Sequence, residues 1–353
     1  MSSADEDALL AIGQRLFGAA APRGLKARSV GTGGAIAGST TGSREERSTA
    51  VRQKLQAIAR RSPEVMVKVS GTSRGFGHLR AHFSYISRDG QIELEDQDGQ
   101  VMNGPDGLAE VRADWQSAYP IPEERRGDET EGRDVRRREA FHLVLSMPAG
   151  TPEIALKRAV REFAAEEFSG YQYVMALHTP TTDPDPEPSP HPHVHLTIKS
   201  RALSGVRLNP RKVDLQRWRE RFAERLRDQG LDASATRRQV RLQREPGRGQ
   251  KVQQMIARGV KTQRGDRRLE AKLAASRNEA TRERVLGDLH AVADLLERSG
   301  DSSDRALAGA LRAGLRRVVG LLVGVGGWVW CVCLLLVWVG LCWWGLFVVC
   351  VAV

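Results

Sequence analysis

Residues 171–199 read YQYVMALHTPTTDPDPEPSPHPHVHLTIK, and this stretch decides the fold. Apolar side chains recur at alternate positions in 171–178 and again in 193–199, which is the pattern of half-buried β-strands. The proline-rich segment 179–192 cannot continue either strand, because proline lacks the backbone donor that a sheet needs. Since one loop joins the two segments, we expect them to pair as antiparallel strands.

Three histidines fall on one side of this predicted strand pair. Side chains of a strand point alternately to opposite faces, so His193 and His195 share a face, and antiparallel pairing brings His178 beside them. Neutral imidazole is a common ligand of divalent metals, so the convergence predicts a metal site. Three imidazoles alone would suit Zn²⁺, whereas a site that also takes phosphate oxygens and water suits Mg²⁺ or Mn²⁺. The alternative for an isolated His-x-His pair is a solvated strand face.

Two further strands and a helix precede this pair. Alternation in 65–71 and in 141–147 predicts two more strands. Between them, 78–88 has the spacing of an amphipathic helix, with Tyr85 off the apolar stripe. The residues of that stripe are Leu79, Phe83 and Ile86.

Two more helices follow the strands. The first is capped by Thr151, runs to about Phe168 and is closed by Gly170, and the second runs from Asp214 to Gly230. Their predicted buried stripes are Leu156, Val160, Phe163 and Ala164 in the first, and Leu215, Trp218, Phe222 and Leu226 in the second. The whole pattern predicts an α+β fold with a central, mainly antiparallel sheet flanked by helices, followed by a basic helical C-terminal region and an apolar tail.

The charge of the chain is concentrated in one region. The formal net charge is +11, yet residues 201–280 alone contain 22 Lys and Arg against 9 Asp and Glu. Such a basic region indicates a polyanionic partner, nucleic acid before a membrane surface. Arg217, Arg221 and Arg225 repeat every four residues, which suits contact with a phosphate backbone, and the alternative is a surface helix held by Glu–Arg pairs.

The composition divides the chain into four segments. We expect a flexible N-terminal region with a basic helix in 1–60, a domain that contains the predicted strands in 61–240, a basic helical extension in 241–317 and an apolar tail in 318–353. The tail has no charged residue and holds all four cysteines, so it is either a transmembrane segment or a frameshifted end. The N-terminus lacks a signal-peptide pattern, so we expect the bacterial cytoplasm, with membrane association only through the tail.

Four blocks of sequence resemble one known family. They are AHFSYISRDGQIEL, FHLVLSMPAGT, the LHTP and PHPHVHLTIK segments, and GVRLNPRKVDLQRWRERFAERL, in that order along the chain. The chain resembles the conjugative relaxases, or plasmid mobilisation nucleases, of the MobA and T-DNA border-nickase type within the HUH endonuclease superfamily. The resemblance runs from about residue 65 to 240, so it implies that the domain in 61–240 is a relaxase nuclease domain.

This resemblance implies a metal-dependent DNA relaxase. Tyr85 would be the nucleophile that nicks single-stranded DNA at a transfer origin and forms a 5′-phosphotyrosine, and His178, His193 and His195 would bind Mg²⁺ or Mn²⁺. The expected partners are that DNA strand, accessory relaxosome proteins and a type IV secretion coupling protein. We expect DNA contacts from Arg88, Arg207, Arg211, Lys212, Arg217, Arg221 and Arg225.

One departure from the family pattern leaves a role open. Many relatives have an His-x-Asp unit where this chain has Pro180 after His178, so Asp183 or Asp185 is expected to supply the missing carboxylate. The role of His191 is open as well. Two other functions remain: a rolling-circle replication initiator with the same chemistry, and a DNA-binding relative that has lost cleavage.

Overall fold

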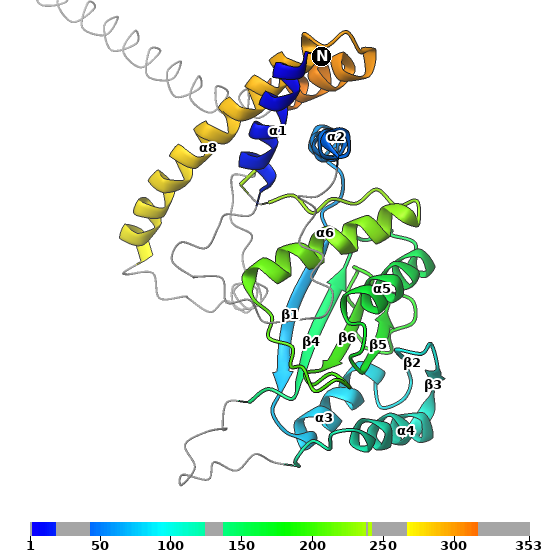
Figure 1. Ribbon diagram of the computed structural model, residues 1–353. Helices are drawn as coiled ribbons and strands as arrows, with labels where there is room; N and C mark the ends of the chain where they lie inside the picture. The colour runs from blue at the N-terminus through cyan, green and yellow to red at the C-terminus, as the bar shows by residue number, and fades with distance from the viewer. Residues whose placement is uncertain (1, 19–42, 124–136, 238, 242–266, 317–353) are drawn as a thin grey trace, which may run out of the picture. The chain divides into compact units, whose positions relative to one another are not determined.

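The computed structural model describes residues 2–18, 43–123, 137–237, 239–241 and 267–316 (Figure 1). These residues form two compact units. Of the described residues, the first unit contains 2–18, 43–60, 236–237, 239–241 and 267–316, and the second contains 61–123 and 137–235. The second unit contains the sheet, so it is the unit that carries the predicted site.

The sheet has six strands in the order β1-β4-β6-β5-β2-β3, and all of its paired neighbours are antiparallel. This arrangement confirms the predicted α+β fold class. The strands are β1 (Met66–Ser73), β2 (Leu94–Asp96), β3 (Val101–Met102), β4 (Ala140–Ser146), β5 (Tyr173–His178) and β6 (His193–Lys199). β1 continues two residues past the predicted end at Gly71, because an irregularity between Val69 and Gly71 lets the strand stay paired with β4.

Helices pack against both faces of this sheet (Figure 1). They are α3 (Phe76–Ser87), α4 (Gly104–Ser117), α5 (Glu153–Glu167) and α6 (Lys212–Asp228). On one face, α5 and α6 bury a cluster that includes Val194, Leu196 and Ile198 of β6. On the other face, α3 and α4 bury a second cluster around Val174 and Ala176 of β5. We call these the α5/α6 face and the α3/α4 face.

The predicted buried stripes are largely present. Leu79, Phe83 and Ile86 of α3 are fully buried, whereas Leu215 of α6 is only partly buried. The helix starts differ from the prediction. α5 begins at Glu153, and Pro152 rather than Thr151 is its N-cap. α6 begins at Lys212, and Asp214, the third residue of the helix, accepts a hydrogen bond from the Arg211 N–H. α6 therefore begins before Asp214, the residue that the sequence predicted as its start.

The other unit is a cluster of helices. It contains α1 (Ser3–Phe17), α2 (Arg44–Arg60), α8 (Arg267–Glu297) and a helical segment over 302–316. Its buried residues come from all four helices, among them Leu9, Leu55, Val292 and Leu311. The sequence had divided these residues between an N-terminal region and a separate C-terminal extension.

Among the described helices, none combines the length and the apolar character needed to cross a membrane. The tail over 318–353, for which a transmembrane segment or a frameshifted end was expected, lies outside the described residues.

Candidate active site and metal centre

Three histidines converge where β5 ends and β6 begins. His178 is the direct cross-strand partner of His193, and His195 is paired with Ala176 one step further along the same face. One ligand atom from each imidazole lies within 4.8 Å of the other two. His178 and His195 are buried and His193 is half-buried. The structure therefore brings together all three residues that the sequence predicted as metal ligands.

Neighbouring groups orient these imidazoles. His178 Nδ1 is hydrogen-bonded to Asp183 Oδ2 at 2.9 Å, and His193 Nδ1 donates to the carbonyl oxygen of His191 at 3.0 Å. A partner on Nδ1 sets the tautomer and leaves Nε2 for a metal. His178 Nε2 also lies 2.7 Å from the carbonyl oxygen of Ile86, so a bound cation would compete with this hydrogen bond.

Asp183 is the carboxylate that contacts the cluster. Arg88 binds Asp183 through two nitrogens, at 2.9 and 3.0 Å, and reaches Asp185 at only 3.3 Å through one. Asp185 has no contact with His178 among the described residues. The left-handed backbone of Arg88, with φ +50°, ends α3 and turns the chain toward this loop. The imidazole of His191 accepts the Ala149 N–H, so its carbonyl rather than its ring is directed at the cluster.

The electrostatics of the cluster suit a cation. Burial lowers the pKa of His195 to about 2 and also lowers the pKa of His193, so both rings are neutral and keep a lone pair. The hydrogen bonds from Arg88 hold the pKa of Asp183 well below its usual range, so this carboxylate stays ionised. His195 Nδ1 is buried without a hydrogen-bond partner. Three imidazoles, two of them held neutral by burial, with one unsatisfied buried nitrogen and one adjacent carboxylate fit a divalent metal.

Tyr85 faces this cluster from α3. Its side chain is 54% exposed, and its ring stands nearly perpendicular to the His195 ring with centroids 5.8 Å apart. The Arg88 guanidinium lies 5.0 Å from the Tyr85 ring centre, so Arg88 contacts both Asp183 and Tyr85. Tyr173 points to the α5/α6 face, where burial raises its pKa to about 12. A reactive phenol is therefore available at the cluster only from Tyr85 among the described residues.

A second pair of imidazoles lies deeper on the same face. The rings of His82 and His142 have centroids 3.6 Å apart, with His82 Nε2 hydrogen-bonded to Thr197 and His142 Nε2 to Ser73. Burial lowers the pKa of His82 to about 4 and that of His142 to about 3. Sequence analysis did not connect His142 with the site. The signal was available, because His142 alternates onto this face in β4 and is the register partner of Thr197.

The residues predicted to contact DNA are dispersed. Arg88 lies at the cluster, whereas Arg207, which donates to the Arg138 carbonyl, lies near the opposite end of β6. Arg211 and Lys212 are exposed at the start of α6. The three α6 arginines are ion-paired with α5: Arg217 with Glu167, Arg221 with Glu166 and Glu167, and Arg225 with Glu166. They lie on the helix that covers the α5/α6 face, away from the histidines.

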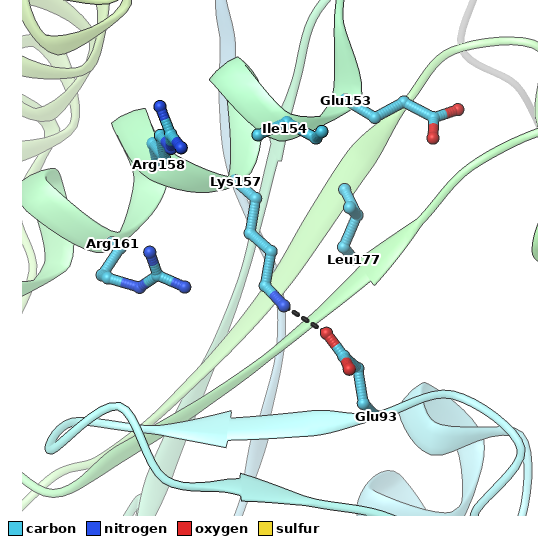
Figure 2. A pocket seen from close by; sticks show the side chains of 7 residues that line it. All are labelled: Glu93, Glu153, Ile154, Lys157, Arg158, Arg161 and Leu177. Carbon is cyan, nitrogen blue, oxygen red and sulfur yellow. Dashed lines mark hydrogen bonds and ion pairs between the residues drawn. The ribbon is translucent and has the colours of Figure 1, made fainter.

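A pocket of about 370 Å³ lies beside α5 (Figure 2). Lys157 forms an ion pair with Glu93 there, and both Lys157 and Arg161 pair with the buried Glu95. The pocket is lined by Leu177, which alternates to the face opposite His178. The ion pairs of Lys157 and Arg161 with Glu95 hold β2 against α5.

Comparison with known proteins agrees with this geometry. Residues 106–231 match the relaxase family described as MobA/VirD2-like, nuclease domain. The chain is 27% identical over 131 residues to the T-DNA border endonuclease VirD2 of Rhizobium radiobacter, and 29% identical over 132 residues to that of Rhizobium rhizogenes.

These matches cover part of each protein. They span 34% of this chain and 30% and 29% of the two relatives, so the chain spans less than a third of the length of the curated relatives it matches. The family match includes the three histidines and Asp183 and begins after Tyr85. The histidine cluster therefore lies within the part of the chain, residues 106–231, that is similar to MobA/VirD2-like relaxase nuclease domains.

Proposed function

We propose that this protein nicks and rejoins one strand of DNA at a plasmid transfer origin, for conjugative mobilisation. The observation that carries the proposal is the exposed phenol of Tyr85 facing His195 of the three-histidine cluster. The similarity to T-DNA border endonucleases supports a nuclease of DNA transfer over a rolling-circle replication initiator.

In the proposed reaction the Tyr85 phenol attacks the scissile phosphorus. The bond between phosphorus and the tyrosine oxygen forms as the bond to the 3′ oxygen breaks, the phenol loses its proton and the leaving oxygen gains one. The product is a 5′-phosphotyrosine and a free 3′-OH. Because the new ester keeps the bond energy of the old one, attack by a 3′-OH reverses the step and rejoins the strand.

The surrounding residues have separate tasks in this proposal. His178, His193 and His195 would hold Mg²⁺ or Mn²⁺, which supplies positive charge to the phosphoryl oxygens. Asp183 orients His178 through Nδ1. Arg88 binds Asp183 and lies against the Tyr85 ring, so it would fix the position of the nucleophile relative to the metal ligands.

The proximity of Asp183 to His178 bears on the cleavage-deficient alternative. That alternative rested on the missing His-x-Asp unit, and a carboxylate 2.9 Å from His178 Nδ1 supplies the equivalent contact from a different position in the loop. The wider setting belongs to the proposal as well: a cytoplasmic enzyme that acts with accessory relaxosome proteins and a type IV secretion coupling protein.

Replacement of the nucleophile tests the proposal. Tyr85→Phe removes only the attacking oxygen, so nicking of supercoiled origin plasmid should fall by about 10⁴-fold or more, while binding of single-stranded DNA is retained. The covalent DNA adduct, detected by its slower migration in a denaturing gel, should disappear. Tyr171→Phe is the matched control. An adduct that persists in Tyr85→Phe would place the nucleophile elsewhere.

A further inference from the structure

Tyr119 has a strained backbone that its surroundings hold in place. Its φ is +52°, a left-handed conformation that is uncommon for a residue other than glycine. The Gln116 side chain closes the turn by accepting the Ile121 N–H at 2.7 Å and donating to the Ile121 carbonyl at 3.0 Å. Lys199 donates to the carbonyls of Trp115 and Ala118 just before it. Such strain persists only where the surrounding structure fixes it, and it recurs at functional positions.

This fixed tyrosine supports a hairpin that follows β6. The Arg201 guanidinium lies 3.8 Å from the centre of the Tyr119 ring, and the Tyr119 hydroxyl donates to the Leu203 carbonyl. The hairpin is closed by the bridge between Arg201 and Arg207 and by the Ala202 N–H donating to Val206. Its residues are thus held against Tyr119 in one arrangement.

Large apolar side chains on this hairpin are open to solvent. Tyr119 is 37% exposed, Leu203 65% and Val206 49%, in a chain where most such side chains are buried. Arg201 has no ion-pair partner among the described residues. Arg207 pairs with Glu139, whose carboxylate also pairs with Arg137. The surface is therefore both apolar and positively charged.

We propose that Tyr119, Arg201, Leu203, Val206 and Arg207 form a stacking platform for unpaired bases of single-stranded DNA. Non-sequence-specific single-strand sites combine cationic side chains with an aromatic ring or a guanidinium plane on which bases stack. This combination of chemistry fits a single strand better than a duplex, whose bases are already stacked. The inference rests on the proposed function, because it assigns a binding surface for that substrate.

The position of the platform suits a strand that passes through the active site. Arg201 lies six residues beyond His195 and just past the end of β6, or roughly 20 Å away if the chain stays extended at about 3.3 Å per residue. A strand of about 4–16 nucleotides, the usual size of single-strand sites, spans that length. The platform thus binds DNA beyond the nucleotides that contact Tyr85 and sets how long a strand the enzyme needs.

Binding as a function of strand length tests the platform. The probes are fluorescein-labelled oligothymidylates of about 4 and about 16 nucleotides, measured by anisotropy with the full chain and excess chelator, so that no cleavage step contributes. Tyr119→Gly removes the ring and suits the left-handed backbone, but it also removes the contacts to Arg201 and Leu203, so urea denaturation first checks that the variant is folded. It should bind the long strand about tenfold more weakly and the short strand as the parent does. Arg201→Gln should act in the same direction.

Two controls keep the result interpretable. Tyr119→Phe keeps the stacking ring and should bind both strands as the parent does, and Ile154→Ser removes an exposed apolar side chain from the α5/α6 side and should have no effect. Unchanged binding of the long strand by Tyr119→Gly, or an equal loss for both lengths, would overturn the platform. Neither outcome bears on the proposed function, which is tested separately by the Tyr85→Phe adduct.

Discussion

The two faces of one sheet differ sharply in this protein. Along β6, His193 and His195 lie on the α3/α4 face with polar neighbours and an exposed tyrosine, whereas Val194 and Leu196 lie on the α5/α6 face in a fully apolar cluster. The same strand thus supplies a reactive surface and a hydrophobic core at alternate residues. Because side chains alternate strictly, the apolar face holds the backbone rigid while the other face carries groups that are costly to bury.

The cations of the two faces differ as well. On the α3/α4 face Arg88 joins a carboxylate to the ring of Tyr85, so its contacts lie at the reacting groups. On the α5/α6 face Lys157, Arg161 and Arg221 pair with glutamates and connect helices to the sheet or to each other. The number of basic residues in a region is therefore a weaker indicator of DNA contact than whether each basic side chain is already paired with a carboxylate.

The largest expected effects come from substituting two neighbouring residues of β6, one on each face of the sheet. His195→Ala should reduce nicking by about 10³-fold through loss of the cation while unfolding free energy changes little. Leu196→Ala should lower unfolding free energy by about 2–5 kcal/mol with the nicking rate of the folded protein retained. Plasmid nicking and urea denaturation measure the two quantities. Parental nicking by His195→Ala, or by the parent after exhaustive chelation, would contradict the metal site.

A smaller effect distinguishes the two candidate carboxylates. Asp183→Asn removes the charge that orients His178, so we expect Mn²⁺ affinity to fall by about 10–100-fold. Asp185→Asn is the matched control, because the Asp185 carboxylate contacts Arg88 and the Glu187 N–H but not His178, and it should change the affinity little. Titration calorimetry with Mn²⁺ measures both. Equal losses in the two variants would show that the loop, rather than the His178 contact, sets the affinity.

The buried pair of imidazoles predicts how stability depends on pH. Burial holds the pKa of His142 at about 3, below the unfolded value of about 6.5, so the unfolded chain binds the extra proton first as pH falls. The neutral folded form is therefore fully stable above about pH 6.5 and loses stability from there down to about pH 3, by up to about 1.4 kcal/mol per pH unit. His142→Asn should flatten this slope in urea denaturation, and His78→Asn, on the exposed side of α3, should not. A slope unchanged by His142→Asn would assign it to other groups.

The smallest expected effect concerns α6, where DNA contact by Arg217, Arg221 and Arg225 remains a proposal. Each phosphate contact on a single strand adds about 0.7 to the magnitude of the salt slope of log K, so the triple Gln variant should reduce it by at most about 2. We expect less than that, because each guanidinium must leave Glu166 or Glu167 to reach a phosphate. An unchanged slope would show that these arginines serve only the contact between α5 and α6.

The site could be predicted from sequence as far as local spacing reaches. The alternation in 171–178 and 193–199 predicted both strands and the side on which His178, His193 and His195 meet. The spacing of α3 placed Tyr85 off its buried stripe, where the structure has it. By contrast, β2 and β3 contain three and two residues, too few to show any period, and the sequence did not predict them.

Contacts between residues far apart in the sequence could not be predicted from local spacing. Asp183 rather than Asp185 contacts His178 because of the path of a loop that has no periodic pattern, and Arg88, 95 residues away, binds Asp183 there. His142 reaches His82 only through the pairing of β4 with β6. The packing of α1 and α2 with α8 likewise joins segments more than two hundred residues apart, which composition had separated.

The sequence by itself determined which face of each strand carries imidazoles and which carries apolar side chains, because alternation with period two is a property of the extended backbone alone. Only the tertiary structure decided which carboxylate orients His178, which arginines are already paired with glutamates, and that Tyr119 is held under Arg201. The reason is physical: these contacts depend on register, on helix orientation and on loop paths. Those are set by the packing of the whole unit and not by the spacing of neighbouring residues.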